Sequence, residues 1–560
     1  MQYNILISFL IKESSTSVRK AIILAGIAGM SNAMILAMIN AASQHAEDSE
    51  VRPLYALVFA ICILIYVYSQ RWILTTAAVQ MENIIHRVRM RLVTALAECE
   101  LLDVEMLGRS IIYQGVAQHT QTLSQAASTI ALSLQMAVMI VCSIVYIGYL
   151  SLTSLLVLLC FLGIALFIYF QKFGSIDDDA LLAMKEENQY YLVVSDLVDG
   201  FKEAKLNQLK SNAILGRALR LSVSAADGRA KTQTTYAQHF VFSNTTFYML
   251  LGVMVFIVPL ISQTYADVVQ MSTTAVLFII GPISGIVGSV PMFRASSDAV
   301  SAITELEEKL KIFNKDKISI LGSNIQKSQQ GNTDKYQDFS KIELRDAIFE
   351  FSPKMEEGIR PFKIGPIDLT ITKGDTLFIT GGNGSGKSTL MRVLTGLYPL
   401  TSGKILVDGT VVKQTDFQNY RELFASVFSD FHLSKYLDGV GEFDNDLFDE
   451  WFSIFEFPQK VNLEDEVFST IDLSTGQRKR VALLTAILEK KKIMVLDEWA
   501  ADQDPLFRKK FYTEIIPRLK RKGITIIAIT HDSRFFRYSD HQLHMEEGQI
   551  VEFDPEIFHD

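Results

Sequence analysis

The chain has 560 residues, which is too long for one compact core, because folded domains usually hold about 100 to 200 residues. Hydrophobic residues make up 49% and charged residues 21% of the chain, with a mean hydropathy of +0.22. This composition excludes a disordered or collagen-like chain and is more apolar than that of an ordinary soluble enzyme. The formal net charge of −9 argues against nucleic acid as the main partner, since phosphate binding needs clustered cationic surface.

Six apolar stretches in the first half of the chain are candidates for membrane-spanning helices. A spanning helix needs about 20 mostly apolar residues to cross roughly 30 Å of hydrocarbon. The stretches run from Ala21 to Ala42, Leu54 to Ile73, Thr129 to Leu150, Leu152 to Phe170, Val241 to Ile261 and Ser272 to Met292. We therefore expect an all-α membrane domain with six spans over residues 1–312.

Lysine and arginine are concentrated in two of the connections between these stretches. The second connection holds Arg87, Arg89, Arg91 and Arg109, and the fourth holds Lys172, Lys185, Lys202, Lys205, Lys210, Arg217, Arg220, Arg229 and Lys231. Cationic loops are retained on the cytoplasmic side, so both termini are predicted to be cytoplasmic. Met81 to Glu98 and Ala180 to Arg220 contain no proline and have helical composition, which predicts helical extensions beyond the membrane.

The second half of the chain has a different character. A charged helical stretch, Ala299 to Leu310, leads into a polar segment rich in Lys, Gln, Asn and Ser, which predicts a linker over residues 313–340. From Lys341 onward, short β-branched runs alternate with helical patterns, as is typical of an α/β domain. We expect this domain to cover residues 341–560.

A glycine-rich loop follows the apolar run Thr376 to Thr380 and precedes the helical run Leu390 to Leu397. Strand, glycine loop and helix in this order are the context of a P-loop, in which backbone N–H groups wrap a phosphate. Lys387 can reach the β- and γ-phosphates, and Ser388 can offer its hydroxyl to Mg²⁺. The predicted nucleotide-binding residues of the loop are Gly381, Asn383, Gly384, Ser385, Gly386, Lys387, Ser388 and Thr389.

Two acidic residues, Asp497 and Glu498, end the buried-strand pattern that begins at Ile493. Ligands of parallel sheets gather at the carboxyl ends of the strands. Asp497 can hold Mg²⁺ through its water shell, and Glu498 can orient or polarise a water that attacks the γ-phosphate. A solvated strand end is the alternative interpretation.

The run Leu473-Ser-Thr-Gly-Gln-Arg478 precedes a helical stretch, Lys479 to Glu489. Serine and glycine at a helix N-terminus can form an anion site from exposed N–H groups and the helix dipole. Together with the glycine-rich loop and the two acids, this run resembles the signature motif of the ATP-binding cassette (ABC) proteins. The resemblance covers Lys341 to about Gly548 and implies ATP and Mg²⁺ as ligands.

The resemblance implies further site residues and a partner. Phe351 stands where the family stacks an aromatic ring on adenine, although a place in the strand core is equally open. Asp504 ends the D-loop, and His531, after the strand run Ile524 to Thr530, corresponds to the switch histidine that acts with Glu498 and Lys387 in hydrolysis. In the family, the P-loop of one cassette faces the signature of another across ATP, here Ser474, Thr475, Gly476 and Gln477. One cassette per chain therefore implies a homodimer or a pair with a related chain, with the fold of a type I exporter.

Several positions depart from the common cassette pattern. Ser429 replaces the usual glutamine as a candidate Mg²⁺ contact, Thr475 replaces a glycine, and the run from Trp499 to Pro505 replaces a proline-threonine-serine version. With Val427 to Phe431 and Asp199 to Asn207, these departures resemble the cyclic-peptide exporters. Those half-size transporters move cyclic or lasso peptides and peptide siderophore precursors out of the cytoplasm.

The resemblance implies ATP-driven export of a cyclic or modified peptide by alternating access in a bacterial inner or plasma membrane. A lipid or lipid-linked glycan flippase shares the six-span architecture and stays open, as does an ATP-regulated channel or sensor subunit. The family further implies that the connections near Val104 to Gly108 and Gly200 to Leu209 transmit movement through a groove beside Ser429 to Leu433.

Polar side chains inside the apolar stretches either line a substrate cavity or hydrogen-bond between helices, because they are costly in lipid. These candidates are Asn32, Asn40, Gln135, Asn244, Thr245, Thr246 and Ser284.

Overall fold

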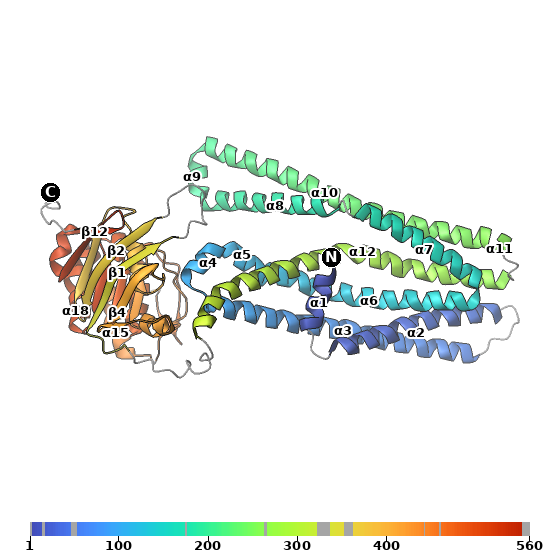
Figure 1. The fold of residues 1–560 in the computed structure, drawn as a ribbon, viewed down its shortest axis with the longest axis horizontal. Helices are drawn as coiled ribbons and strands as arrows, with labels where there is room; N and C mark the ends of the chain where they lie inside the picture. The colour runs from blue at the N-terminus through green and yellow to red at the C-terminus, as the bar shows by residue number, and fades with distance from the viewer. Residues whose placement is uncertain are drawn as a thin grey trace. The chain divides into compact units, whose positions relative to one another are not determined.

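The computed structural model describes residues 3–13, 17–45, 53–173, 176–261, 266–321, 336–351, 362–441, 443–458 and 461–551 (Figure 1). The chain divides into two compact units. The first comprises Met1–Ala97 and Arg109–Leu310, and the second comprises Glu98–Gly108 and Lys311–Asp560. The short segment Glu98–Gly108 therefore belongs to the second unit although the first unit surrounds it in the sequence.

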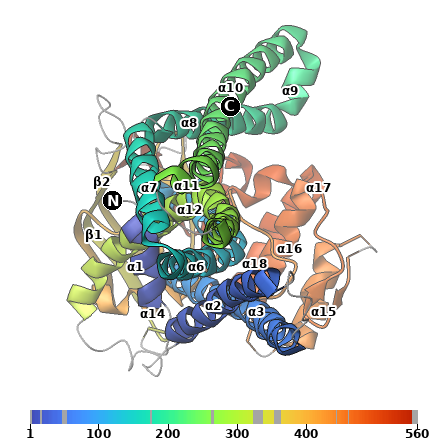
Figure 2. The same cartoon turned by 90° about the vertical axis from the view of Figure 1, so that its right-hand side faces the viewer.

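The described part of the first unit consists of helices. They are α1 (Tyr3–Glu13), α2 (Ser17–His45), α3 (Pro53–Ala97), α5 (Arg109–Tyr113), α6 (His119–Leu150), α7 (Leu152–Phe173), α8 (Ile176–Asp199), α9 (Phe201–Leu206), α10 (Gln208–Gly252), α11 (Val258–Ile261) and α12 (Ala266–Leu321). Two π-helical turns, η1 (Gln114–Gln118) and η2 (Val253–Ile257), join consecutive helices. Helix α2 packs against α3 and α6, and α8 packs against α10 (Figure 2).

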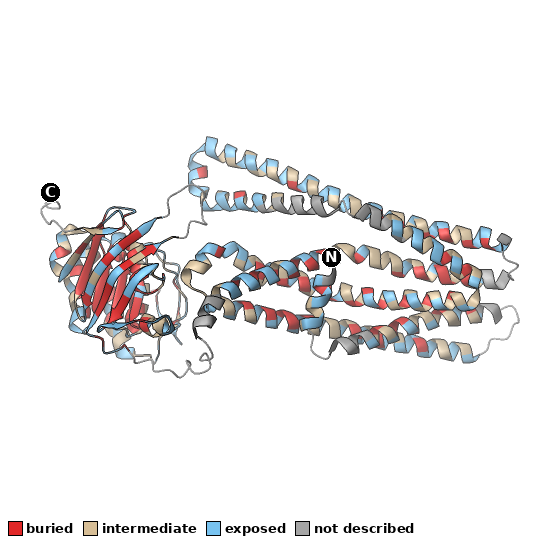
Figure 3. Cartoon of the chain, viewed as in Figure 1, coloured by how far each residue is buried: buried red, intermediate tan, exposed pale blue. Residues whose placement is uncertain are grey.

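Five helical segments among the described residues are long and apolar enough to cross a membrane. They are Ile23–Ala42, Pro53–Ala97, Arg109–Leu150, Gln208–Ile257 and Gln270–Phe313. The remaining predicted span, Leu152 to Phe170, lies in α7, whose described apolar part is the shorter segment Leu152–Ala165. Exposed residues recur along these helices (Figure 3), and many are large and apolar, such as Leu64 and Val145. Apolar surface of this extent suits a lipid environment, and the chain is a membrane protein.

The predicted linker, residues 313–340, is partly helical in the structure. Helix α12 continues to Leu321, so residues 313–321 of the predicted linker are helical. This run contains neither glycine nor proline and includes the strong helix formers lysine and leucine, which explains the continuation. Residues 322–335 of the predicted linker lie outside the described residues.

Helix α1 was not predicted from the sequence. Glu13, at its end, forms an ion pair with Arg91 of α3 at 2.8 Å. Arg91 also pairs with Glu307 of α12 at 3.3 Å. One guanidinium group thus connects three helices that are far apart in the sequence.

The second unit is an α/β domain with two main sheets. An antiparallel sheet has the order β2-β1-β4-β5, with β1 (Lys341–Glu350), β2 (Lys363–Thr372), β4 (Ser402–Val407) and β5 (Thr410–Val411). A six-stranded sheet has the order β12-β11-β3-β10-β9-β6, with β3 (Thr376–Gly381), β6 (Phe424–Val427), β9 (Ile493–Asp497), β10 (Thr525–Ile529), β11 (His541–Glu546) and β12 (Gln549–Val551). Strands β7 (Leu463–Glu464) and β8 (Val467–Phe468) form a separate pair.

Five neighbouring strands of the larger sheet, β11, β3, β10, β9 and β6, run parallel. Every residue of β3, β9 and β10 is buried, as expected for a parallel sheet covered on both faces (Figure 3). Because parallel strands end at the same edge, the loops after β3, β10, β9 and β6 meet there in that order.

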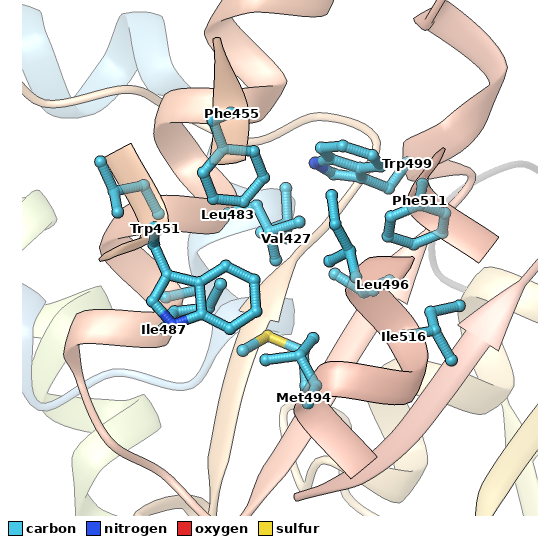
Figure 4. Packing of buried hydrophobic residues seen from close by; sticks show 14 of the residues in the cluster. Val427, Trp451, Phe455, Leu483, Ile487, Met494, Leu496, Trp499, Phe511 and Ile516 are labelled. Atoms are coloured by element: carbon cyan, nitrogen blue, oxygen red, sulfur yellow. The ribbon is translucent and has the colours of Figure 1, made fainter. Parts of the chain in front are cut away.

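The described part of the second unit also contains helices. They are α4 (Leu101–Leu107), α13 (Lys387–Leu394), α14 (Phe417–Arg421), α15 (Asn445–Phe455), α16 (Thr475–Leu488), α17 (Pro505–Lys510) and α18 (Ile516–Arg521), with the short turns η5 (Gln414–Asp416), η6 (Trp499–Asp502), η7 (Phe511–Ile515) and η8 (Ser533–Tyr538). Side chains from β6, β9, α15, α16 and η7 form one cluster (Figure 4). Within it, the rings of Trp499 and Phe511 lie 4.5 Å apart between centroids, so the loop after β9 is anchored in the core.

Candidate functional site

The glycine-rich loop after β3 has a backbone that only glycine permits at two positions. Gly381 has φ 141°, and a Cβ atom there would lie 2.2 Å from the carbonyl oxygen of Met545. Gly386 has φ 101° and immediately precedes α13, which begins at Lys387. The loop therefore ends at a helix N-terminus, where N–H groups and the helix dipole favour a phosphate.

Lys387 is the cation of this loop, and its side chain is buried. Its Nζ donates hydrogen bonds to the carbonyl oxygens of Gly381 and Gly382 at 2.9 and 2.8 Å. Burial lowers the pKa of Lys387, and the carboxylates of Glu498 and Asp497 oppose this shift. A phosphate bound in the loop can take the place of these carbonyl groups as the partner of the ammonium group.

An open cavity of about 370 Å³ lies over the loop. Its lining residues are Phe362, Asn383, Gly384, Gly386, Lys387, Ser388, Thr389 and Glu498. Most of the predicted loop residues and Glu498, the acid that directly follows β9, therefore line the same cavity. Ser385 is buried instead of lining this space.

Asp497 lies at the end of β9 with only 2% of its surface exposed. Its Oδ2 accepts a hydrogen bond from the Ser429 hydroxyl at 3.1 Å, so the serine that replaces the usual glutamine contacts this carboxylate directly. The other oxygen, Oδ1, is buried and has no hydrogen-bond partner among the described residues. A buried, unpartnered carboxylate oxygen is costly, and a hard cation such as Mg²⁺ would satisfy it.

Glu498 and His531 are brought together from neighbouring strands, β9 and β10. The Nε2 atom of His531 lies 3.2 Å from Oε1 of Glu498, and both side chains are partly exposed. The backbone of Glu498 is left-handed, with φ 48° and ψ 37°, an uncommon conformation for a residue with a Cβ atom. The pair places a carboxylate and an imidazole side by side, where each can contact a water molecule or a phosphate oxygen.

The signature turn, Ser474 to Gln477, begins α16 in a capping box. The Ser474 hydroxyl accepts from the N–H of Gln477 at 3.4 Å, and Gln477 Oε1 accepts from the N–H of Ser474 at 3.2 Å. Ser474 and Thr475 are exposed, whereas Gly476 packs so closely that a Cβ atom there would lie 2.7 Å from the carbonyl oxygen of Asp502. The turn thus presents a helix N-terminus to solvent.

Asp504 caps α17 by accepting a hydrogen bond from the N–H of Phe507 at 2.9 Å. It also pairs with Arg480 of α16 at 2.8 Å. The bond from Phe507, with Arg480 adding to it, lowers the pKa of Asp504. The D-loop residue is therefore fixed to the helix that follows the signature turn.

Comparison with known proteins agrees with this geometry. Residues 364–501 match the family model for the ABC transporter. The chain is 34% identical over 427 residues to the ATP-binding protein SyrD of Pseudomonas syringae pv. syringae, covering 73% of this chain and 72% of that protein. This chain belongs to the ABC transporter family.

Other relatives resemble a smaller part of this ABC transporter. The phosphonates import ATP-binding protein PhnC of Lactobacillus acidophilus is 30% identical over 205 residues, 33% of this chain and 80% of PhnC. The energy-coupling factor transporter ATP-binding protein EcfA1 of Streptococcus mutans is 31% identical over 219 residues, 37% of this chain and 76% of EcfA1. The ABC transporter is therefore an ATPase coupled to transport, with its cassette in the second unit.

The aromatic residue beside the cavity of this ABC transporter differs from the predicted one. Phe351 packs with Phe349 and Tyr398, at 4.9 and 5.9 Å between ring centroids, and is not among the residues that line the cavity. Phe362 lines it, is 38% exposed, and lies against Gly386. The N–H of Phe351 donates to the carbonyl oxygen of Phe362, so the two residues are paired through their backbones. Their rings nevertheless lie apart, that of Phe351 on Phe349 and Tyr398 and that of Phe362 at the cavity. Phe362 directly precedes β2, and an aromatic residue at the start of this strand is the sequence signal that could have identified it.

Segment Glu98–Gly108, which contains α4, is bound to the cassette by charged side chains. The Tyr398 hydroxyl donates to Glu105 at 2.6 Å, and Arg392 lies 3.6 Å from the same carboxylate. Arg392 also pairs with Asp430 at 3.2 Å, and burial raises the pKa of Tyr398 to about 12. Arg392 thus connects the expected transmitter, Val104 to Gly108, with the residue that follows Ser429.

Two of the predicted polar residues of the spans, Asn40 and Asn32, make contacts between helices. Asn40 of α2 donates to the Tyr146 hydroxyl of α6 at 3.4 Å and to the carbonyl oxygen of Met271 of α12 at 3.3 Å. The amide of Asn32 lies 3.1 Å from the sulfur of Met139. These two asparagines therefore contact neighbouring helices.

The remaining candidates lie on α6, α10 and α12. Ser284 donates to Asn244, which connects α12 with α10. Thr246 donates to the carbonyl oxygen of Phe242 on its own helix, Thr245 is exposed, and Gln135 is buried. The buried Oε1 of Gln135 has no hydrogen-bond partner among the described residues.

We predict that Phe362→Ala weakens ATP binding, because stacking of a base on an aromatic ring contributes about 1 to 3 kcal/mol. The dissociation constant for ATP should rise roughly 5- to 100-fold, measured by titration calorimetry on the purified transporter. Phe351→Ala is the matched control and should lower the melting temperature with ATP affinity within about twofold of the parent. The opposite pattern would assign the stacking role to Phe351.

Proposed function

We propose that this ABC transporter is an exporter of a cyclic or modified peptide, or of a peptide siderophore precursor, across a bacterial inner or plasma membrane. The observation that carries this proposal is the 427-residue similarity to SyrD, which is longer than the whole region from Lys341 to Asp560 and so extends into the membrane-spanning part. The Trp499-to-Pro505 loop and Ser429 support the same subgroup. In this proposal both termini are cytoplasmic.

The proposed chemistry is ATP hydrolysis at the edge where β3, β10, β9 and β6 end. The P-loop and Lys387 bind the phosphates, and Phe362 stacks on adenine. Glu498 accepts a proton from the attacking water, and His531, 3.2 Å away, holds that carboxylate and the γ-phosphate in place. Bound Mg²⁺ would neutralise charge on the phosphate oxygens, and Ser388, Asp497 and Ser429 would hold it.

A second copy of the chain completes each site in this proposal. The exposed turn Ser474–Gln477 offers an anion-binding helix terminus, while the cavity of the same chain is lined by other residues. Two chains related by a twofold axis place each turn over the other chain's nucleotide. Two nucleotides would then hold the cassettes closed, and hydrolysis would release them.

Movement would reach the spans through α4, which the chain connects to α3 and, after Gly108, to α5. Glu105 of α4 contacts Tyr398 and Arg392, and Arg392 contacts Asp430 beside Ser429. A short series of contacts therefore connects Asp497 and Ser429 with α4, through Asp430 and Arg392. Alternating opening of the spans follows from such a link.

Substrate stimulation of ATP hydrolysis tests the proposed cargo class. The purified transporter in liposomes should hydrolyse ATP several-fold faster with cyclic or lasso peptides than with linear peptides of the same composition. Lipids and lipid-linked glycans added as a second panel should have no such effect. Stimulation by lipids alone would replace the peptide proposal with a flippase.

Glu498→Gln tests the hydrolysis mechanism. Loss of general base catalysis costs about 100- to 10,000-fold in rate, so turnover should fall by at least roughly 100-fold while ATP still binds. The variant should accumulate as a nucleotide-bound dimer, measured by light scattering with and without ATP. Normal turnover would overturn the role of Glu498, and a monomer that hydrolyses ATP at the parent rate would overturn the dimer.

Charge reversal tests the contact through α4. Glu105→Arg should leave unstimulated ATP hydrolysis within about threefold of the parent and remove most of its stimulation by substrate, because Arg392 loses its partner on α4 and faces a like charge there. The double variant Glu105→Arg with Arg392→Glu should restore stimulation. Full stimulation in the single variant would show that this contact carries no coupling.

A further inference from the structure

Lys479 of α16 places an ammonium group in the protein interior behind Glu498. Its side chain is 4% exposed. The Nζ atom donates to the backbone carbonyl oxygen of Glu498 at 2.8 Å and pairs with Asp502 Oδ2 at 2.7 Å. A buried cation is unfavourable unless it is paired and hydrogen-bonded, and these two contacts stabilise it there.

Lys479 contacts Glu498 at a residue whose backbone conformation is unusual. Glu498 has φ 48° and ψ 37°, which is unfavourable for a residue with a Cβ atom and persists only where surrounding groups hold it. The Lys479 ammonium group fixes the carbonyl of that same residue. Because the backbone angles set where the side chain begins, this bond controls the direction of the Glu498 carboxylate.

A reciprocal bond strengthens the link. The indole Nε1 of Trp499 donates to the backbone carbonyl oxygen of Lys479 at 2.8 Å. Trp499 is 1% exposed and packs on Phe511 in the core (Figure 4). Glu498 and Trp499 are thus both bonded to Lys479. The Lys479 side chain bonds to the Glu498 backbone, and the Lys479 backbone bonds to the Trp499 side chain.

The loop after Trp499 is bonded to the signature turn as well. Gln503 Nε2 donates to the carbonyl oxygen of Gly476 at 3.0 Å, and Arg480 donates to Gln503 Oε1 at 2.9 Å. The first turns of α16 and the loop that carries Glu498 are therefore joined by several hydrogen bonds, one of them from the Lys479 ammonium group.

We propose that Lys479 is a positioning residue for hydrolysis: it holds the Glu498 backbone so that the carboxylate faces the γ-phosphate, and it joins Glu498 to the signature turn of the same chain. This inference rests on the proposed function, in which Glu498 is the base and the signature turn contacts the other chain's nucleotide. Lys479 then connects the two nucleotides of the dimer. It bonds to Glu498, which acts on the nucleotide of its own chain, and it lies beside the signature turn, which contacts the nucleotide of the other chain.

Lys479→Met in the full-length transporter tests the positioning role. The kcat for ATP should fall roughly 10- to 100-fold, since a misplacement of about 1 Å costs up to about 100-fold, while the dissociation constant for ATP stays within about twofold. Lys510→Met is the matched control, because Lys510 also donates to a backbone carbonyl, that of Ile454, and to a carboxylate, that of Glu456. Its kcat should stay within about twofold of the parent, and an equal loss in both variants would overturn the proposal.

Asp502→Asn separates positioning from a structural role. It removes the ion pair but keeps the bond from Lys479 to the Glu498 carbonyl, so kcat should stay within about threefold of the parent even if the melting temperature falls. Lys479→Arg keeps a cationic donor and should recover part of the rate lost in Lys479→Met. If Lys479→Met does not fold, Lys479→Gln with its neutral donor replaces it, with a smaller expected loss in kcat. Rates that follow the melting temperature across these variants would overturn the proposal.

A double variant distinguishes failure of this inference from failure of the proposed function. In a Glu498→Gln background, Lys479→Met should cause no further loss of the residual rate, because Lys479 acts through Glu498. A further loss of the same factor would overturn the positioning role. If Glu498→Gln alone leaves turnover normal, the proposed base is wrong instead.

Discussion

The site depends on one constraint of the fold, the order β3-β10-β9-β6 of four parallel strands. Parallel strands leave the sheet at one edge, so four loops that are distant in the sequence meet there. The P-loop, His531, Glu498 and Ser429 follow these strands, and Asp497 is the last residue of β9. Complete burial of β3, β9 and β10 opposes a shift of these strands, because a shift would disturb the packing of buried side chains.

Charged side chains with little exposure to solvent connect the site at the sheet edge to the rest of the second unit. Lys479 bonds to the Glu498 carbonyl, and Arg392 lies between Glu105 of α4 and Asp430. Buried or half-buried charges keep a fixed geometry, because an unpaired one is expensive to accommodate. The cassette therefore has two defined connections, one toward the signature turn and one toward α4.

The first unit obeys a different constraint. Its helices expose large apolar side chains, which lipid accepts, so few positions need a specific partner. The polar contacts of Asn40 with Tyr146 and of Ser284 with Asn244 fix neighbouring helices against one another. The buried Gln135 oxygen makes no such contact with any described residue.

Local sequence determined the membrane-spanning stretches, the P-loop, the acids after β9 and the capped signature turn, because hydrophobic length, glycine conformation and helix capping are short-range properties. Only the tertiary structure decided that Phe362 and not Phe351 lines the cavity, that Ser429 bonds to Asp497, and that Glu98–Gly108 belongs to the second unit. These facts depend on strand pairing and on packing between residues far apart in the chain. No local pattern records such contacts, because they arise only when burial brings distant segments together.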